Sequence, residues 1–76
     1  MVEAYVLVAV EPGQEREVFD SLSSVNGVES LNEIYGEWDI ILKLTVKDIK
    51  EIDTIVTDRI RKNPAVKLTS TMIVAR

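Results

Sequence analysis

The segment at residues 2–10, VEAYVLVAV, decides the fold because it predicts a strand that is apolar on both faces. Successive side chains of a strand point to opposite faces. One face therefore carries Val2, Ala4, Val6, Val8 and Val10, and the other carries Glu3, Tyr5, Leu7 and Ala9. Beyond the glutamate both faces are apolar, so the strand needs cover on both sides in a chain that has few other elements.

Beyond this strand the apolar spacing changes to a helical period. The tripeptide EPG at residues 11–13 breaks the strand. From Gln14 onward the apolar residues form one stripe of a helix: Val18, Phe19, Leu22 and Val25. The pair Asn26-Gly27 is a good helix stop, because glycine accepts the left-handed backbone conformation at low cost.

A predicted hairpin follows the first helix. The segment VESLNEIY at residues 28–35 predicts a second strand with an irregularity near Ser30 to Asn32, and GEWD at 36–39 turns the chain. The segment IILKLTV at 40–46 predicts a third strand, with Lys43 and Thr45 on its outer face. Its inward side chains are Ile40, Leu42, Leu44 and Val46.

The last part of the chain predicts a second helix and a fourth strand. Asp48 begins the helix, Glu51 follows in a variant of the capping box, and Pro64 ends it. Its apolar stripe consists of Ile49, Ile52, Ile55, Val56 and Ile60. In the strand AVKLTSTMIVA at 65–75, alternation puts one set of side chains on the helix-facing side: Val66, Leu68, Ser70, Met72 and Val74. The opposite side then carries Lys67, Thr69, Thr71, Ile73 and Ala75.

The whole chain, residues 1–76, therefore reads as one βαββαβ domain of the α+β class. Right-handed crossovers fold this order into a ferredoxin-like sandwich, with a four-stranded antiparallel sheet and both helices on one face. The strands at 2–10 and 40–46 lie in its centre. The uncovered face predicts association between subunits, sheet against sheet or edge to edge. Its apolar side chains are Tyr5, Leu7, Ala9, Ile41, Ile73 and Ala75.

The composition opposes several classes of protein. Cysteine and histidine are absent, which removes disulfides and most zinc, copper or iron sites. A net charge of -4 opposes direct binding to nucleic acid. No apolar run approaches the ~20 residues that span a bilayer, and no leader opens the chain, so we expect a cytoplasmic protein. We interpret Arg59, Arg61 and Lys62 as cations at a helix C-terminus, with a partner or nucleic-acid contact as the alternative.

No constellation of residues supports catalysis. Without His or Cys, the candidates are carboxylates, lysines, tyrosines and hydroxyls, and the acids are scattered over predicted helix faces. The three glycines lie at separate turns, so they do not form a phosphate-binding loop. We therefore expect no enzyme activity, no catalytic residue, no metal site and no cofactor.

Two polar features remain as candidate binding residues, YGEWD at 35–39 and TST at 69–71. Each has a structural interpretation, because Asp39 can accept a local backbone N–H, Trp38 can cover a small core and strands favour threonine. Across a contact between subunits, however, the turn of one chain can approach the hydroxyls of another. Together they offer an acid for an ammonium group, exposed amides around Gly36 for a carboxylate, and an aromatic wall. A free amino acid displays the matching groups.

The chain resembles the ligand-sensing (RAM) domain of the Lrp/AsnC, or feast/famine, transcription regulators. The resemblance rests on NGV at 26–28, GEWDIILKLTV at 36–46 with its Gly-x-aromatic-Asp start, and TSTMIVAR at 69–76. It extends from Ala4 to Ala75. It implies a ferredoxin-like domain that dimerises through its sheet. Dimers then join into octamer- or decamer-like rings that bind small effectors, typically amino acids, between dimers.

Carried over residue by residue, the resemblance implies a ligand-binding set: Tyr35, Gly36, Trp38, Asp39, Thr69, Ser70 and Thr71. The glycine, tryptophan and aspartate of the turn contact the charged ends of the ligand, and the last strand supplies hydroxyls. The tyrosine stands where a smaller residue is common in the family. The helix-turn-helix of family regulators is missing. We therefore expect a stand-alone module in transcription regulation of amino acid metabolism, which joins mixed oligomers with full-length regulators and makes no direct contact with DNA.

Two other interpretations stay open. One is a small ferredoxin-like enzyme of the dimeric monooxygenase or isomerase type, whose site lies between sheet and helices and needs a polar cluster in the core. The other is a structural assembly subunit that binds no ligand.

Overall fold

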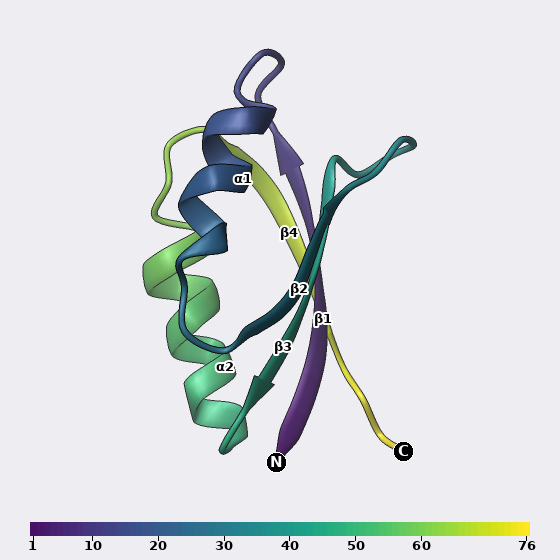
Figure 1. Cartoon of the computed structure of the whole chain (residues 1–76), viewed down its shortest axis with the longest axis vertical. Coiled ribbons are helices and arrows are strands. Elements are labelled where there is room, and N and C mark those ends of the chain that lie inside the picture. Colours follow the sequence, from purple (N-terminus) through teal and green to yellow (C-terminus); the bar gives the residue numbers. More distant parts are fainter.

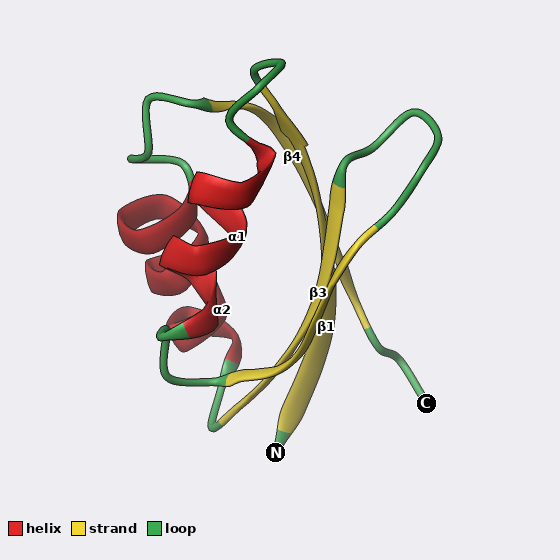
Figure 2. Ribbon diagram, turned by 45° about the horizontal axis from the view of Figure 1, so that its top comes forward, coloured by secondary structure: helices red, strands yellow, loops and turns green.

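The computed structural model describes residues 1–76 as a curved sheet with helices on one side (Figure 1). In chain order the elements are β1 (Val2–Val10), α1 (Glu15–Ser23), β2 (Val28–Glu33), β3 (Ile40–Val46), α2 (Ile49–Ile55), the π-helical turn η1 (Val56–Ile60) and β4 (Val66–Ile73). The strands pair antiparallel in the order β2-β3-β1-β4, and Figure 2 shows both helices on the same face. The predicted α+β, ferredoxin-like βαββαβ fold is confirmed. None of the helices is long and apolar enough to span a membrane.

The core lies between the central strands and the helices, and all of its buried side chains are apolar. On β1 the residues Ala4, Val6 and Val8 are 0% exposed, while the neighbours on the other face of the same strand are only partly covered. The four predicted inward residues of β3 are all buried. Since burial stabilises by about 25 cal/mol per Å² of apolar surface, this layer is the main source of stability.

The second helix begins as predicted and then departs from the predicted stripe. The N–H of Glu51 donates to Asp48 Oδ1 (2.9 Å), and the Glu51 carboxylate accepts from the N–H of Lys47 (3.2 Å). Ile52 and Ile55 are buried, but Ile49 is 58% exposed, so its predicted place in the core is wrong. As the first residue of the helix it lies at the rim of the sheet, beside Ile73 of the edge strand β4, where the core ends.

Both edge strands contain a bulge, and one of them overturns a prediction. In β4, Val66 opposes Val10 and Leu68 opposes Ala9, so Lys67 is an extra residue without a partner. A strand alternates with a period of two, and one extra residue therefore turns every later side chain to the other face. Cross-strand partners share a face. The residues that face the open side are therefore Leu68, Ser70 and Met72, and those on the helix side are Thr69, Thr71 and Ile73, the reverse of the prediction.

The bulge in β2 lies close to its predicted place. Val28 opposes Leu44 and Ser30 opposes Lys43, which leaves Glu29 as the extra residue, just before the predicted irregularity. The resulting change of face turns Leu31 toward the core, against which it packs.

Gly27 joins α1 to β2 in a conformation that two constraints restrict to glycine. Its φ is +99°, and an added Cβ would lie 3.0 Å from Val46 Cγ1 and 3.2 Å from Ile55 Cδ1. Gly13 has a similar φ of +88° but nothing within 4 Å of the Cβ position.

We predict that Gly27→Ala lowers the free energy of unfolding by about 2–5 kcal/mol, because left-handed strain and overpacking of the core add up. Gly13→Ala is the matched control and should lower it by about 1–2 kcal/mol, from backbone strain alone. Urea denaturation of both variants measures the difference. Equal losses would show that Val46 and Ile55 move aside without cost.

Candidate functional site

The turn between β2 and β3 is tied to the end of β1 by its aspartate. The N–H of Val10 donates to Asp39 Oδ2 (2.7 Å), and the N–H of Asp39 donates to the carbonyl of Val8 (2.9 Å). The N–H of Ile34 donates to the carbonyl of Asp39 (2.9 Å) and closes the base of the turn. The carboxylate therefore accepts a backbone N–H, as its structural interpretation predicts, but from a strand 29 residues away rather than from its own turn.

A pocket of about 360 Å³, here called the corner pocket, lies beside this turn. Its lining comes from the β1–α1 connection, the start of α1, the end of β2 and the β2–β3 connection. Figure 1 shows that the two connections lie at the same end of the sheet. Its lining residues are Gly13, Glu15, Arg16, Glu33, Ile34, Tyr35 and Asp39. The volume lies at the lower end of the range of about 300–1,000 Å³ that is typical of small-molecule sites.

The corner pocket contains some of the predicted turn residues but not all. Tyr35 and Asp39 line it, whereas Gly36 and Trp38 do not. Tyr35 is fully exposed at its rim, Trp38 is half-buried, and Gly36 has a φ of +134° that suits glycine.

The residues that the sequence analysis missed come from α1, from the connection before it and from the end of β2: Gly13, Glu15, Arg16, Glu33 and Ile34. The predicted strand order could have identified these residues as neighbours of the turn. It places the end of β1 beside the start of β3, and so brings the EPG connection to the GEWD turn.

The TST segment lies away from this pocket within one chain. Thr71 lines a second, mainly apolar hollow of about 190 Å³ between α2 and β4, with Ile73 beside it. Thr69 lines a shallow hollow near Arg61, and Ser70 is on the open face of the sheet. The predicted position of Ser70 on the helix-facing side is therefore wrong, because the bulge at Lys67 turns it to the open face.

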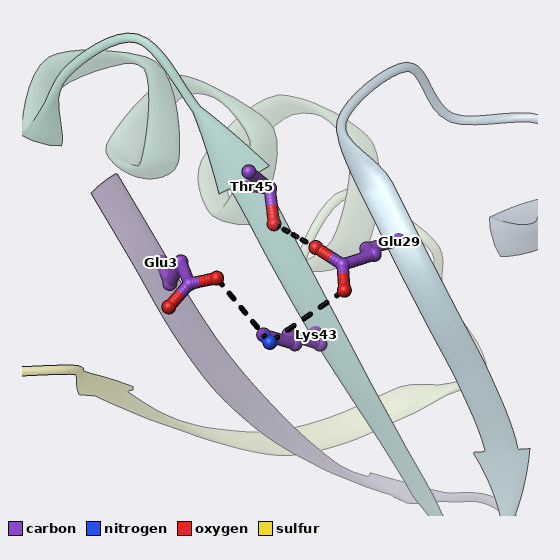
Figure 3. Close-up of polar contacts among 4 residues, drawn as sticks. All are labelled: Glu3, Glu29, Lys43 and Thr45. Carbon is purple, nitrogen blue, oxygen red and sulfur yellow. Dashed lines mark hydrogen bonds and ion pairs between the residues drawn. The ribbon is translucent and has the colours of Figure 1, made fainter. Parts of the chain in front are cut away.

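The open sheet face has apolar side chains around one polar cluster. The apolar residues are Tyr5, Leu7, Ala9, Ile41, Leu68 and Met72. Of the predicted set, Ile73 belongs to the helix side and Ala75 lies beyond the strand end. In the polar cluster, Lys43 Nζ lies 3.3 Å from Glu3 Oε2 and 3.5 Å from Glu29 Oε2, and Thr45 Oγ1 donates to Glu29 (Figure 3).

These contacts shift two titrations. The hydrogen bond from Thr45, together with the charge of Lys43, lowers the pKa of the Glu29 carboxyl below its ordinary value. The hydrogen bond to Glu3, helped by the charges of both glutamates, raises the pKa of Lys43. Glu29 and Lys43 are therefore both charged near neutral pH.

We predict a small acid-dependent loss of stability that Glu29→Gln removes. Because the pKa of Glu29 is lower in the folded protein than its ordinary value of 4.5, the ionised carboxylate stabilises the fold above pH 4.5. This contribution to the free energy of unfolding is lost as the pH falls through the pKa of the folded state. Thermal melts between pH 3 and 7 should therefore show a flatter acid limb for Glu29→Gln. Glu11→Gln, at an exposed acid without a side-chain contact, is the control and should follow the wild type. Parallel acid limbs for all three proteins would contradict the role of the cluster.

Fold and site together define a small ferredoxin-like domain with a polar pocket at one end of the sheet and an open, partly apolar sheet face. The chain belongs to the Lrp/AsnC ligand binding domain family, whose sequence model matches residues 3–76. The resemblance that the sequence analysis identified is confirmed.

Individual relatives agree with this assignment. The chain is 35% identical over 72 residues to the HTH-type transcriptional regulator PF1231 of Pyrococcus furiosus, covering 95% of this chain and 49% of that protein. It thus spans about half the length of the curated regulators it matches. A segment of a homocitrate synthase of Saccharolobus islandicus is 38% identical over 55 residues, covering 72% of this chain and 12% of the synthase.

Solved structures show the same fold. The crystal structure of FFRP-DM1 matches with a TM-score of 0.93 at 39% identity, covering 97% of this chain and 99% of that one. The regulator NMB0573 of Neisseria meningitidis, solved as a complex with L-Met, matches with a TM-score of 0.87 at 22% identity. That alignment covers 99% of this chain and 50% of that one.

Proposed function

We propose that this domain binds an amino acid effector at the corner pocket and assembles with other copies through its open sheet face, in transcription regulation of amino acid metabolism. The observation that carries the proposal is the carboxylate of Asp39. One of its oxygens accepts the N–H of Val10, the other has no hydrogen-bond partner in the chain, and the residue lines the pocket. A fixed carboxylate with a free oxygen is suited to an ammonium group.

The relatives support an effector role. The family is described by its ligand binding, one distant structural relative holds L-Met, and curated relatives are transcriptional regulators. The match to a segment of a synthase supports a binding role that is separable from DNA contact. The core between sheet and helices contains no polar side chain, which favours binding over the enzyme alternative.

Assembly completes the proposed site. The hydroxyls of Thr69, Ser70 and Thr71 lie on the edge strand β4, away from the corner pocket of their own chain. In the proposal a neighbouring copy, within a ring of dimers, supplies them to the ligand. In the proposal the domain also joins mixed oligomers with full-length regulators.

A thermal-shift screen over the twenty amino acids tests effector binding. An effector present at 100 times its Kd should stabilise the domain by about 2.7 kcal/mol, which raises the Tm by about 10 °C or more. Asp39→Asn keeps an acceptor for the Val10 N–H but loses the charge, so it should fold and show no shift. Asp58→Asn, an exposed acid on η1, is the control and should respond like the wild type.

Two outcomes of this screen would count against the proposal. If no amino acid changes the Tm of the wild type, effector binding of this class is wrong. If Asp39→Asn responds like the wild type, the aspartate is not part of the site.

Sedimentation of surface variants tests assembly. Leu68 on the open face is 64% exposed in the single chain, and Leu68→Glu should convert the wild-type oligomer into smaller species because it buries a charge in the interface. Thr57→Glu adds the same charge at an exposed residue of η1, outside the hollow that contains Thr71, and should leave the assembly unchanged. A wild type that sediments as a single chain at micromolar concentration would refute assembly.

A further inference from the structure

Arg16 is the one cation that lines the corner pocket, and its charge is not satisfied within the chain. Both ion pairs of the structure belong to Lys43, on the open sheet face. Arg16 lies in the first turn of α1, is exposed, and shares the pocket wall with three acids. A guanidinium offers N–H donors in a planar fork that matches a carboxylate. It is therefore the group in this pocket best suited to the carboxylate of a ligand.

The three acids of the pocket are held differently and do not converge on one point. Glu15 accepts the N–H of Gly13 (3.0 Å), and Asp39 accepts the N–H of Val10 (2.7 Å). Glu33, the last residue of β2, makes no ion pair. No group of three acids is close enough to hold a metal ion. These acids are therefore better suited to separate cationic groups of one ligand than to a single metal ion.

The net charge of the residues that line the corner pocket favours one class of amino acid side chain in the ligand. Three carboxylates, Glu15, Glu33 and Asp39, and one guanidinium leave two formal negative charges in excess (3 − 1 = 2). A neutral amino acid, as a zwitterion, leaves that excess uncompensated, and an acidic one adds to it. A cationic side chain reduces it, which is favourable wherever like charges are close.

The apolar part of the lining leads to the same conclusion. Only Ile34 and Tyr35 among the lining residues are hydrophobic, and the tyrosine is fully exposed at the rim. A leucine or methionine side chain gains affinity by leaving water for an apolar wall. This pocket offers little of that wall.

Resting on the proposed function, we infer that the corner pocket takes an amino acid with a cationic side chain. Arg16 binds its carboxylate, Asp39 binds its α-ammonium group, and Glu33 binds the cation at the end of the side chain.

Titration calorimetry with three amino acids tests the class of ligand. L-norleucine has the unbranched side chain of L-lysine without the terminal ammonium, and L-glutamate has the opposite charge. The wild type should bind L-lysine about 10-fold or more tightly than L-norleucine, because a charge-assisted contact is lost, and should bind L-glutamate least. Glu33→Gln should reduce the preference for L-lysine over L-norleucine. Equal or tighter binding of L-norleucine would overturn the inference.

A second titration tests the role of Arg16. Arg16→Gln should weaken binding of L-lysine about 10-fold or more but should not weaken binding of 1,5-diaminopentane, which has no carboxylate. Arg59→Gln removes the same charge at an exposed position outside the pocket and is the control. Both substitutions are at exposed positions, and thermal melts confirm that each variant is folded. Wild-type affinity of Arg16→Gln for L-lysine would exclude the arginine.

The two proposals fail in different ways. If the protein binds a neutral or acidic amino acid and Asp39→Asn abolishes that binding, the effector function stands and the cationic class is wrong. If the protein binds neither L-lysine nor any other amino acid, the proposed function itself is wrong.

Discussion

Strand β1 is apolar on both faces, and the two helices of the chain cover only one of them (Figure 2). Right-handed crossovers place both helices on the same side, so the valines of that side are sealed while Tyr5 and Leu7 stay partly exposed. The end of the same strand holds Asp39 through the N–H of Val10. Core, open face and pocket therefore all depend on this central strand.

The two polar regions of the surface differ in how their charges are satisfied. On the open face, Lys43 lies between Glu3 and Glu29, and the cluster is complete within one chain. Each charge in this cluster has a partner of opposite sign within the chain, and the two glutamates and one lysine leave one formal negative charge in excess (2 − 1 = 1). At the corner pocket, acids and an arginine line one wall without forming ion pairs. This contrast separates a surface suited to packing from a surface suited to a charged small molecule.

The sequence predicted the elements of the fold because each has a clear period and clear stop signals. It could not predict the face of each β4 side chain, because nothing in AVKLTSTMIVA marks Lys67 as a bulge and plain alternation carries the error to Ser70. At the site, YGEWD stood out by its composition, and Tyr35 and Asp39 do line a pocket. The sequence alone did not identify Arg16 as a pocket residue, because it resembles any other exposed basic residue on a helix. Only the fold shows that it lies in the same pocket as Tyr35 and Asp39 of the β2–β3 turn.

The bulge at Lys67 has a consequence for the outer surface of the edge strand β4. If Lys67 were instead paired opposite Ala9 as an ordinary strand residue, every later residue of β4 would move by one position and face the other side of the sheet. The open face would then display Thr69 and Thr71 in place of Leu68 and Met72, with no change in composition. The pairing of one residue on this edge strand therefore decides whether its outer surface is apolar or rich in hydroxyl groups.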